Sequence, residues 1–477
     1  RWGAKMGDVK SLDMMLGALN CPFGTGHMGV TAENVATEHQ ITREDQDAFA
    51  MTSQERAAAA IAEGRFDSQI TPVKVRVKRD EVDFLVDEHP KQTSLEKLAG
   101  LRLDAAINDR YGTRATVGLA LQDIASGDVR QVTLPPEADI ADISWKPDGS
   151  KVVFTNTRAD AMDLFVLDTQ TATARKIMTG GVNPIFQTPR WMPDGSLLVL
   201  TIPANRGPKP VESLTPSGPA IQDASGGAEA QTRTYQDLLE NPYDEALFEW
   251  LTTSQPVVMN ADGTGTRAIG TPRVYTDVTP SPDGEYLLME WIEKPFSYQV
   301  PYYRFPTPTA VFTRDGELVQ IIAEQTLADA LPVQGVVTGR RNIQWHPTED
   351  ALLIWAEAQD GGDPRVESDN RDNLLALAAP FDGEGRVFAR LEDRASGSGG
   401  IEGTDDLIVV DYDRDTREVR QTLVDVTGDN PPRVLNLRNV QDAYNDPGTP
   451  LSTYTDRGFS VARNVDGKLL LTGSGAT

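Results

Sequence analysis

Short apolar runs separated by turn residues recur along most of this chain of 477 residues. The clearest copy, 143–156, reads Ile-Ser-Trp-Lys-Pro-Asp-Gly-Ser-Lys-Val-Val-Phe-Thr-Asn. Two more copies lie at 189–201 and 278–290, and a weaker copy lies at 343–355. In the full copies, proline presets φ, aspartate bonds back to the following amides, and glycine accepts a positive φ without steric cost. The pattern predicts a series of β-hairpins.

The spacing of these copies indicates how the hairpins are organised. If Trp145, Trp191, Pro280 and Trp345 are equivalent, the intervals are 46, 89 and 65 residues. A repeat of about 40–50 residues made of short strands is typical of a β-propeller blade, and blades stack because one hairpin cannot bury its own face. The longer intervals require insertions or diverged turns, and 397–404 departs most from the pattern. The alternative is a β-sandwich with several Asp-Gly turns.

The first hundred residues have a different, partly helical pattern. Thr42-Arg-Glu-Asp resembles a capping box, so we predict a helix that begins at Thr42 and is ended by Gly64. Another helix is predicted to start within 31–37. The segment 70–77 alternates as a strand does, and 94–101 is predicted to be a short helix.

Composition excludes several classes of function. The net charge of −26 and the pI near 4.6 argue against binding to nucleic acid or to anionic membrane surfaces, whose phosphates repel such a chain. The single cysteine, Cys21, excludes an internal disulfide framework, and the four histidines are too scattered for a zinc site. No run of 18 apolar residues is present, so no membrane span is expected. We therefore predict no metal, no nucleic acid and no membrane partner.

Two carboxylate pairs were considered as chemistry-bearing sites. Asp405 with Asp406, and Asp411 with Asp413, suggest a calcium loop or an acid/base pair. Neither pair has the Asp-x-Asp-x-Asp-Gly run with a later glutamate that a calcium loop requires. In so acidic a chain, we predict that both pairs are solvated turns.

An aromatic stripe at 298–305 also admits two interpretations. Tyr298, Tyr302, Tyr303 and Phe305, together with Arg304, suggest a surface that contacts peptides. Such stripes more often pack in the core between blades, because their large rings gain most from burial. We predict a core role.

Several sequence motifs in the first hundred residues together resemble one known protein family. The chain reads His27-Met-Gly-Val-Thr-Ala-Glu-Asn-Val-Ala at 27–36, and related strings lie at 3–10, 43–50, 53–60 and 64–67. Together they closely resemble the loop-domain section of thiolases, the acetyl-CoA acyltransferases. The resemblance covers about residues 1–102 and implies an α/β fragment of that fold.

The thiolase resemblance implies a binding pocket but not a reaction. By that resemblance, Leu19, His27, Met28 and Arg102 line a pocket for coenzyme A and its pantetheine arm. Thiolysis needs two cysteines and a histidine in a Gly-His-Pro setting, which lie outside this section, and Cys21 matches neither cysteine. We therefore predict no catalytic residue, a vestigial pocket, and no cofactor unless the fragment retains coenzyme A binding. His27 is expected to be satisfied within its glycine-rich loop.

A second resemblance begins near residue 98. It rests on ordered strings at 98–110, 140–145, 189–195 and 233–239, and on Lys-Pro-Phe-Ser-Tyr-Gln-Val-Pro-Tyr-Tyr-Arg-Phe-Pro at 294–306. These strings look like the N-terminal propeller of prolyl-oligopeptidase-type serine peptidases, in particular the glutamyl-endopeptidase-like branch. The resemblance covers about 98–477.

In that family the propeller is a lid on an α/β-hydrolase domain that follows it in the chain. The hydrolase carries its serine on a Gly-x-Ser-x-Gly elbow, followed by an acid and a histidine. The 477 residues contain no such elbow, and no histidine follows His346. By the same resemblance, 203–227 and 233–250 elaborate the mouth through which peptides enter; the alternative is a solvated insertion.

The predicted chain is therefore mainly β, with two domains: an incomplete thiolase-like loop domain at 1–102, and a β-propeller at 103–477 that is expected to be truncated at its C-terminus. Residues 98–102 satisfy both family patterns, which suggests a splice of two sequences. The predicted function is a non-catalytic, substrate-gating propeller of a serine peptidase, with peptide substrates reached through a missing hydrolase domain. The alternatives are a thiolase-related acyl-CoA acyltransferase and a propeller that binds a protein partner.

Overall fold

The computed structural model describes residues 19, 27–66, 69–71, 73–77, 80–84, 96–110, 116–136, 138–212 and 235–473. The chain divides into two compact units, Arg1–Ser94 and Leu95–Thr477, called the first and second unit below. Within the described ranges, no helix has the length and apolar character needed to cross a membrane.

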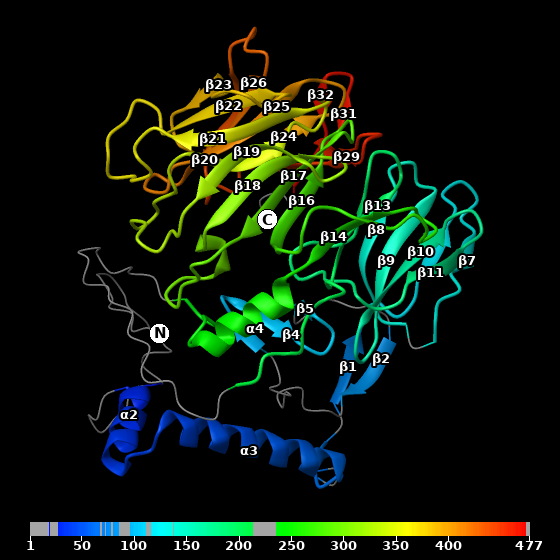
Figure 1. Ribbon diagram of the computed structural model, residues 1–477, viewed down its shortest axis with the longest axis vertical. Helices are drawn as coiled ribbons and strands as arrows, with labels where there is room; N and C mark the ends of the chain where they lie inside the picture. Colours follow the sequence, from blue (N-terminus) through cyan, green and yellow to red (C-terminus); the bar gives the residue numbers. More distant parts are fainter. Residues whose placement is uncertain are drawn as a thin grey trace, which may run out of the picture. The chain divides into compact units, whose positions relative to one another are not determined.

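The described part of the first unit contains two helices and one hairpin. These are α2 (Met28–His39), α3 (Arg43–Ala62), and the antiparallel pair β1 (Val73–Val77) and β2 (Asp80–Phe84) (Figure 1). The predicted capping box is confirmed: Asp45 N–H donates to Thr42 Oγ1 at 3.1 Å, and Thr42 N–H donates to the Asp45 carboxylate at 3.1 Å. Gly64 follows the helix with φ of 66°, as the predicted stop requires.

The helix predicted at 94–101 is wrong. This segment forms β3 (Glu96–Leu98) and β4 (Leu101–Asp104), which pair antiparallel around a tight turn and continue to β5 (Asp109–Arg110). Ala99 and Gly100 both have positive φ, 53° and 86°, which a helix does not allow. Leu98, Leu101 and Leu103 are buried together with side chains of α4 (Pro242–Thr252). Burial in a tertiary core has overridden the local helical preference.

In its described residues, the second unit contains four four-stranded antiparallel sheets, called blades 1 to 4, and a six-stranded sheet whose four antiparallel strands β24–β27 are called blade 5. Blade 1 comprises β8 (Ile140–Trp145), β9 (Lys151–Thr157), β10 (Met162–Asp168) and β11 (Thr173–Met178). Blade 2 comprises β12 (Arg190–Trp191), β13 (Leu197–Thr201), β14 (Gln255–Met259) and β15 (Arg267–Ala268). Blade 3 comprises β16 (Val274–Pro280), β17 (Tyr286–Ile292), β18 (Thr307–Thr313) and β19 (Leu318–Gln325). Blade 4 comprises β20 (Arg340–Trp345), β21 (Leu352–Ala358), β22 (Asp372–Ala378) and β23 (Arg386–Leu391). Blade 5 comprises β24 (Arg394–Ile401), β25 (Asp406–Tyr412), β26 (Glu418–Asp425) and β27 (Arg433–Asn439).

Shorter elements accompany the blades. A two-stranded sheet, β6 (Ala120–Gln122) and β7 (Val129–Gln131), precedes blade 1, and the short 3₁₀ helix η1 (Tyr302–Arg304) precedes β18. After blade 5 come β28 (Thr449–Pro450), β29 (Ser452–Tyr454), β30 (Ser460–Ala462), β31 (Asn464–Val465), β32 (Lys468–Leu469) and β33 (Leu471–Thr472). The hairpin β29–β30 joins blade 5, because β30 pairs in parallel with β24.

The alternation of side chains explains why the sheets stack. In β13, Leu197 and Val199 pack with blade 1, whereas Leu198 and Leu200 pack with blade 3. Since both faces of the sheet are covered, the strand is a continuous apolar run rather than an apolar–polar alternation. The same arrangement links blades 3 and 4, and blades 4 and 5. This stacking of short antiparallel sheets confirms the predicted propeller, seen in Figure 1 as successive sheets from cyan to orange.

The predicted hairpin turns are confirmed. Gly149, Gly195 and Gly284 have φ of 70°, 82° and 74°, the left-handed conformation that the Pro-Asp-Gly pattern requires. In blade 5, Gly403 with φ of 72° takes this place between β24 and β25. The departure at 397–404 therefore does not interrupt the series of blades.

The prediction that both carboxylate pairs are solvated turns is wrong for Asp411. Asp405 is exposed at a turn, and Asp413 accepts hydrogen bonds from the N–H groups of its own turn. Asp411 instead lies in β25 and is 1% exposed, with Arg420 Nη1 3.6 Å from its carboxylate. The period of the strand places it on the buried face with Leu407 and Val409. Its burial raises its pKa, against the opposing effect of Arg420.

The core interpretation of the aromatic stripe is confirmed with one exception. Phe305 is buried in a cluster with Phe248 of α4 and with Phe296, and Tyr298 and Tyr302 are half-buried against it. This cluster joins α4, β3 and β4 to Val274 and Ile292 of blade 3 rather than filling a seam between two blades. Tyr303, by contrast, is 60% exposed.

Candidate functional site: the central channel

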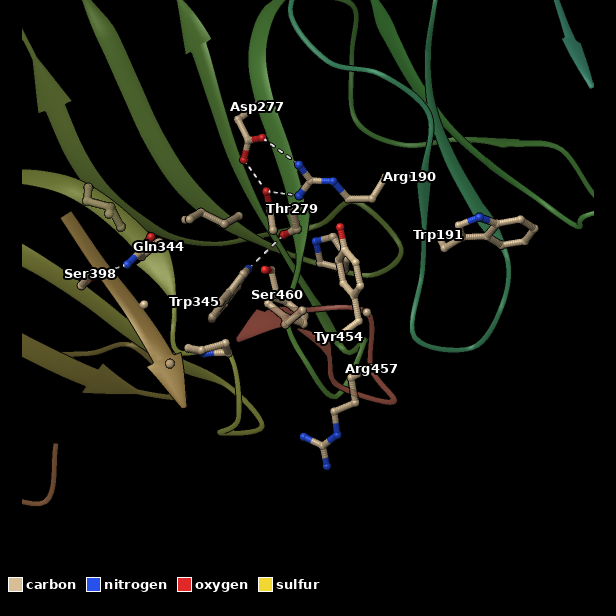
Figure 2. Close-up of a pocket in the computed structure, with 18 of the residues that line it drawn as sticks. Arg190, Trp191, Asp277, Thr279, Gln344, Trp345, Ser398, Tyr454, Arg457 and Ser460 are labelled. Carbon is tan, nitrogen blue, oxygen red and sulfur yellow. Dashed lines mark hydrogen bonds and ion pairs between the residues drawn. The ribbon is translucent and has the colours of Figure 1, made fainter. Parts of the chain in front are cut away.

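The inner strands of all five blades line one cavity of about 650 Å³, called the channel below. Each blade contributes side chains from its first strand: Ser144, Arg190, Thr279, Gln344 and Ser398. In the sheets of blades 1 to 4 this first strand is the end strand. Figure 2 shows four of these side chains, Arg190, Thr279, Gln344 and Ser398, coming from different strands. The arrangement follows from the radial repetition of blades.

The repeated tryptophan of the sequence pattern joins successive blades at the channel wall. Trp191 Nε1 donates to the carbonyl of Ser144 at 3.1 Å, and Trp345 Nε1 donates to the carbonyl of Thr279 at 2.9 Å. In both cases the accepting carbonyl belongs to the residue directly before the repeat position of the previous blade, which is Trp145 in blade 1 and Pro280 in blade 3. Trp145 of blade 1 is 54% exposed. The tryptophan therefore recurs because its ring fills a seam and its N–H reaches a neighbouring backbone carbonyl.

One part of the channel wall is an ionic and hydroxyl network between blades 2 and 3. Arg190 Nη1 donates to Thr279 Oγ1 at 2.6 Å, and Arg190 Nη2 is 3.4 Å from Asp277 Oδ1. The Thr279 hydroxyl in turn donates to Asp277 (Figure 2). These groups satisfy one another, so the wall is polar but held in a defined geometry.

The channel wall also contains a carboxyl group with altered acidity. Glu290 of β17 lines the channel and accepts a hydrogen bond from Thr276 Oγ1 at 2.7 Å. Its burial raises the pKa of Glu290, and the hydrogen bond from Thr276 acts in the opposite direction. Across the channel, Gln344 Nε2 donates to Ser398 Oγ at 2.6 Å, which links blades 4 and 5.

The hairpin β29–β30 contributes the remaining wall. Tyr454 and Ser460 line the channel, and Arg457 at the hairpin turn forms an ion pair with Asp350 of blade 4. Figure 2 shows Tyr454 and Ser460 beside Trp345. A strand hairpin from the C-terminal segment therefore occupies space between the blades.

Hydroxyl side chains form part of the channel lining. Three serines, Ser144, Ser398 and Ser460, lie among the described lining residues. His346 follows the lining residue Trp345 but is fully buried, with Nδ1 3.3 Å from Thr348 Oγ1, and its burial lowers its pKa. The prediction that the chain has no catalytic residue stays a prediction.

The four residues predicted to line a coenzyme A pocket lie in both units. Leu19, His27 and Met28 belong to the first unit, and Arg102 lies on β4 of the second. His27 caps α2, since its Nδ1 accepts the Gly29 N–H at 3.1 Å, and Met28 is exposed. Arg102 Nε lies 2.8 Å from the carboxylate of Asp237, and both residues belong to the second unit. The coenzyme A pocket stays a prediction.

Sequence reasoning did not single out the channel residues. Arg190 and Gln344 directly precede the repeat tryptophans, and Ser144 directly precedes Trp145. A strand alternates its side chains, so the residue before each repeat tryptophan points away from the seam that the tryptophan fills. The position directly before each repeat tryptophan is therefore the sequence signal from which the channel lining could have been predicted.

Five blades around one polar channel define the second unit as a β-propeller domain. The chain is 35% identical over 407 residues to a probable chloroplastic glutamyl endopeptidase of Oryza sativa subsp. japonica, covering 80% of this chain and 43% of that protein. A probable chloroplastic glutamyl endopeptidase of Arabidopsis thaliana is 34% identical, with 80% and 42% covered. The chain thus spans less than half the length of these relatives.

The beginning of the chain matches a different family. The model of the thiolase N-terminal domain matches residues 1–118. A β-ketothiolase of Cupriavidus necator is 50% identical over 109 residues, which is 23% of this chain and 25% of that protein. Both resemblances predicted from the sequence motifs are confirmed: the chain is similar to a thiolase fragment followed by a glutamyl-endopeptidase-like propeller.

Solved structures with similar folds include a prolyl endopeptidase, with a TM-score of 0.45, 12% identity, and coverage of 86% of this chain and 50% of that one. The β-propeller domain of the Trilobed protease from Pyrococcus furiosus has a TM-score of 0.38 and 10% identity, with 70% and 85% covered.

Proposed function

We propose that the second unit is the substrate-gating propeller of a glutamyl-endopeptidase-like serine peptidase, and that it cleaves no bond by itself. The observation that carries the proposal is the single polar channel that the inner strands of all five blades share, in a sequence similar to glutamyl endopeptidases. Peptide hydrolysis is then the activity of a hydrolase domain served by this propeller.

The dimensions and walls of the channel support selection by size. A cavity of about 650 Å³ holds a short extended peptide and is far smaller than a folded domain. Its walls are joined across blades by Arg190 with Thr279, by Gln344 with Ser398, and by the indole of Trp345. Such cross-blade bonds resist widening, so a folded protein is excluded while an unfolded segment enters.

The claim that the chain cleaves no bond is tested with a serine-directed fluorophosphonate probe. We expect no labelling of the purified 477-residue chain, under conditions that label the rice relative. Covalent labelling that maps to a serine of this chain contradicts the proposal.

Gating is tested by grafting the second unit in place of the corresponding segment of the rice relative. We expect the chimera to cleave a short fluorogenic peptide and to leave a folded protein substrate intact. Arg190→Ala, which removes a side chain from the channel wall, is expected to increase cleavage of longer peptides with little change for the short one. Arg390→Ala, at an exposed position of the outer strand β23, is the matched control. Equal effects of the two variants contradict selection in the channel.

A second candidate function, acyl transfer with coenzyme A, is favoured by the match of residues 1–118 to thiolases. Titration calorimetry of the whole chain with coenzyme A separates it from the first. We expect no saturable heat, because the thiolase chemistry needs residues beyond the matched section. Saturable binding that His27→Ala abolishes supports the thiolase alternative.

A further inference from the structure

One strand of this chain already occupies the channel edge of blade 5. β30 pairs in parallel with the end of β24, matching Gly400 with Val461 and Ile401 with Ala462. The N–H of Glu402 donates to the carbonyl of Ala462 at 3.0 Å. The inner edge of this blade is therefore able to accept an added strand within the channel.

The N–H of Ala395 on β24 already donates to Asp372, but no second strand is matched to residues 396–399 on this edge in the described chain. β30 is matched with only the last two residues of β24, which spans Arg394–Ile401. Because backbone groups alternate along a strand, Ser398 presents its N–H and C=O on the side that Gly400 turns toward β30. At Gly397 and Gly399, no atom lies within 4 Å of the position that a Cβ would take. An unpaired strand edge with so little side-chain cover is a template for another strand.

Buried and exposed contacts together hold β30 in place, and Phe459, which directly precedes it, packs against the apolar cluster shared by blades 3 and 4. Val461 is 2% exposed and is its buried anchor. Arg463 Nη1 lies 2.7 Å from Glu402 Oε1, and the N–H of Asn464 donates to Glu402 Oε2 at 3.1 Å. Arg457 pairs with Asp350 at the hairpin turn. The arginines are about half exposed, and exposed ion pairs contribute little to stability, so these two ion pairs by themselves do not prevent displacement of the hairpin.

We propose that the edge of β24 binds an extended polypeptide segment by parallel strand addition, and that β30 is an internal occupant that competes for this edge. The inference rests on the proposed role of the channel in admitting peptides, and it names the binding mode. Backbone amides supply most of the recognition, so many sequences bind, while the place of Val461 favours a small apolar side chain. The chain thus holds its own channel partly closed until a peptide displaces β30.

The test uses the whole chain and a fluorescein-labelled synthetic peptide that copies residues 458–463. Val461→Asp places a charge at the buried anchor and releases β30 from β24. We expect this variant to bind the peptide at least tenfold more tightly than the unchanged chain, in which the tethered strand competes. Val465→Asp, the same substitution at an exposed position of β31, is the matched control and is expected to bind as the unchanged chain does. Fluorescence anisotropy gives the affinities.

The peptide itself has a control. A copy with proline in place of its valine and alanine loses two amide donors and is expected to bind none of the proteins. Equal binding of the proline copy overturns strand addition, and failure of the Val461→Asp variant to gain affinity overturns competition by β30.

If circular dichroism shows that Val461→Asp does not fold, the double variant Arg457→Ala/Arg463→Ala takes its place. It removes only the two exposed ion pairs, and the expected gain is about threefold; no gain overturns the proposal. Loss of peptide binding leaves size selection by the grafted propeller untouched, so the two proposals fail separately.

Discussion

Blade 4 is joined to its two neighbours by different physical means. Toward blade 3, the seam is apolar: Trp345, Leu353 and Phe381 pack with Leu288 and Val311. Toward blade 5, an apolar cluster is supplemented by buried ion pairs. The first kind of seam depends on area removed from water, and each side chain contributes separately.

The ionic part of the second seam is an interdependent network. Asp372, which is fully buried, accepts from Arg341, from Arg394 Nη1 at 2.7 Å, and from the N–H of Ala395 at 2.7 Å. Arg394 also pairs with the buried Asp360. Removal of one member leaves its partners charged and buried, so a network of this kind is sensitive to single substitutions. The comparison predicts a different response of each seam to mutation.

The largest effect is expected for Asp372→Ala. It strips the buried Arg341 and the partly buried Arg394 of a carboxylate, and breaking a buried pair costs about 3–5 kcal/mol. The free energy of unfolding is measured in urea by tryptophan fluorescence, which reports on the second unit because all tryptophans but Trp2 lie there. Asp363→Ala, which removes a largely exposed pair with Arg365, is the control and should cost much less stability. If the two variants lose a similar free energy of unfolding, the buried network is not more sensitive to substitution than an exposed pair, and the proposed difference between the seams is wrong.

Leu353→Ala probes the apolar seam. Leu353 is fully buried, and truncation of such a leucine costs about 2–5 kcal/mol through lost burial and a residual cavity. Leu318→Ala on the exposed outer strand β19 should change the free energy of unfolding by about 0.5 kcal/mol or less. Unlike the Asp372 variant, the Leu353 variant should lose the same stability at high and low salt, and a strong salt dependence contradicts an apolar seam.

Lowering the pH is expected to reduce the free energy of unfolding through His346, which lies in the turn between β20 and β21 of blade 4. His346 is fully buried, and desolvation lowers its pKa below the ordinary 6.5, outweighing the opposing effect of Asp405. The unfolded chain therefore binds a proton at higher pH than the folded chain does. The contribution of neutral His346 to the free energy of unfolding is complete above pH 6.5. As the pH is lowered, this contribution falls by at most about 1.4 kcal/mol per pH unit until the pKa of His346 in the folded chain is reached.

The measurement for this prediction is the urea midpoint between pH 8 and pH 5, compared with that of His346→Gln. The variant should have a shallower dependence in this window, because no histidine titrates at that place. Identical profiles for the two proteins exclude His346 as the source of the loss.

The smallest effect is expected for Trp345→Phe. The ring still fills the seam, but the indole N–H no longer reaches the carbonyl of Thr279, and loss of one such bond costs about 1 kcal/mol. Trp145→Phe alters the equivalent exposed position of blade 1 and should be nearly neutral. A larger loss at Trp145 than at Trp345 shows that the repeat tryptophan does not act through the seam.

Features that depend on neighbouring residues were predictable from the sequence. Thr42 caps α3 as its capping box indicated, and Gly149, Gly195 and Gly284 have the positive φ that their turns require. These outcomes follow from steric and hydrogen-bonding rules that act over four residues. The resemblance to two families was also predictable from the sequence, because it rests on sequence motifs that occur in the same order along the chain.

Features that depend on distant segments were not predictable in this way. Ser94 to Leu101 looked helical, yet Leu98 and Leu101 belong to a hairpin buried against α4. Asp411 looked like a solvated turn residue, yet Arg420 meets it on a buried strand face. The channel lining was overlooked because it exists only where five strands, far apart in sequence, converge.

By itself, the sequence determined that this chain joins a thiolase-like section to a series of propeller hairpins, and where each of the main hairpins turns. Only the tertiary structure decided that β30 lies on β24, that the network around Asp372 is buried, and that five strand edges share one polar channel. The reason is physical: turns and caps are set by local sterics, whereas burial and strand pairing are set by whichever distant surfaces remove the most area and the most unpaired backbone from water.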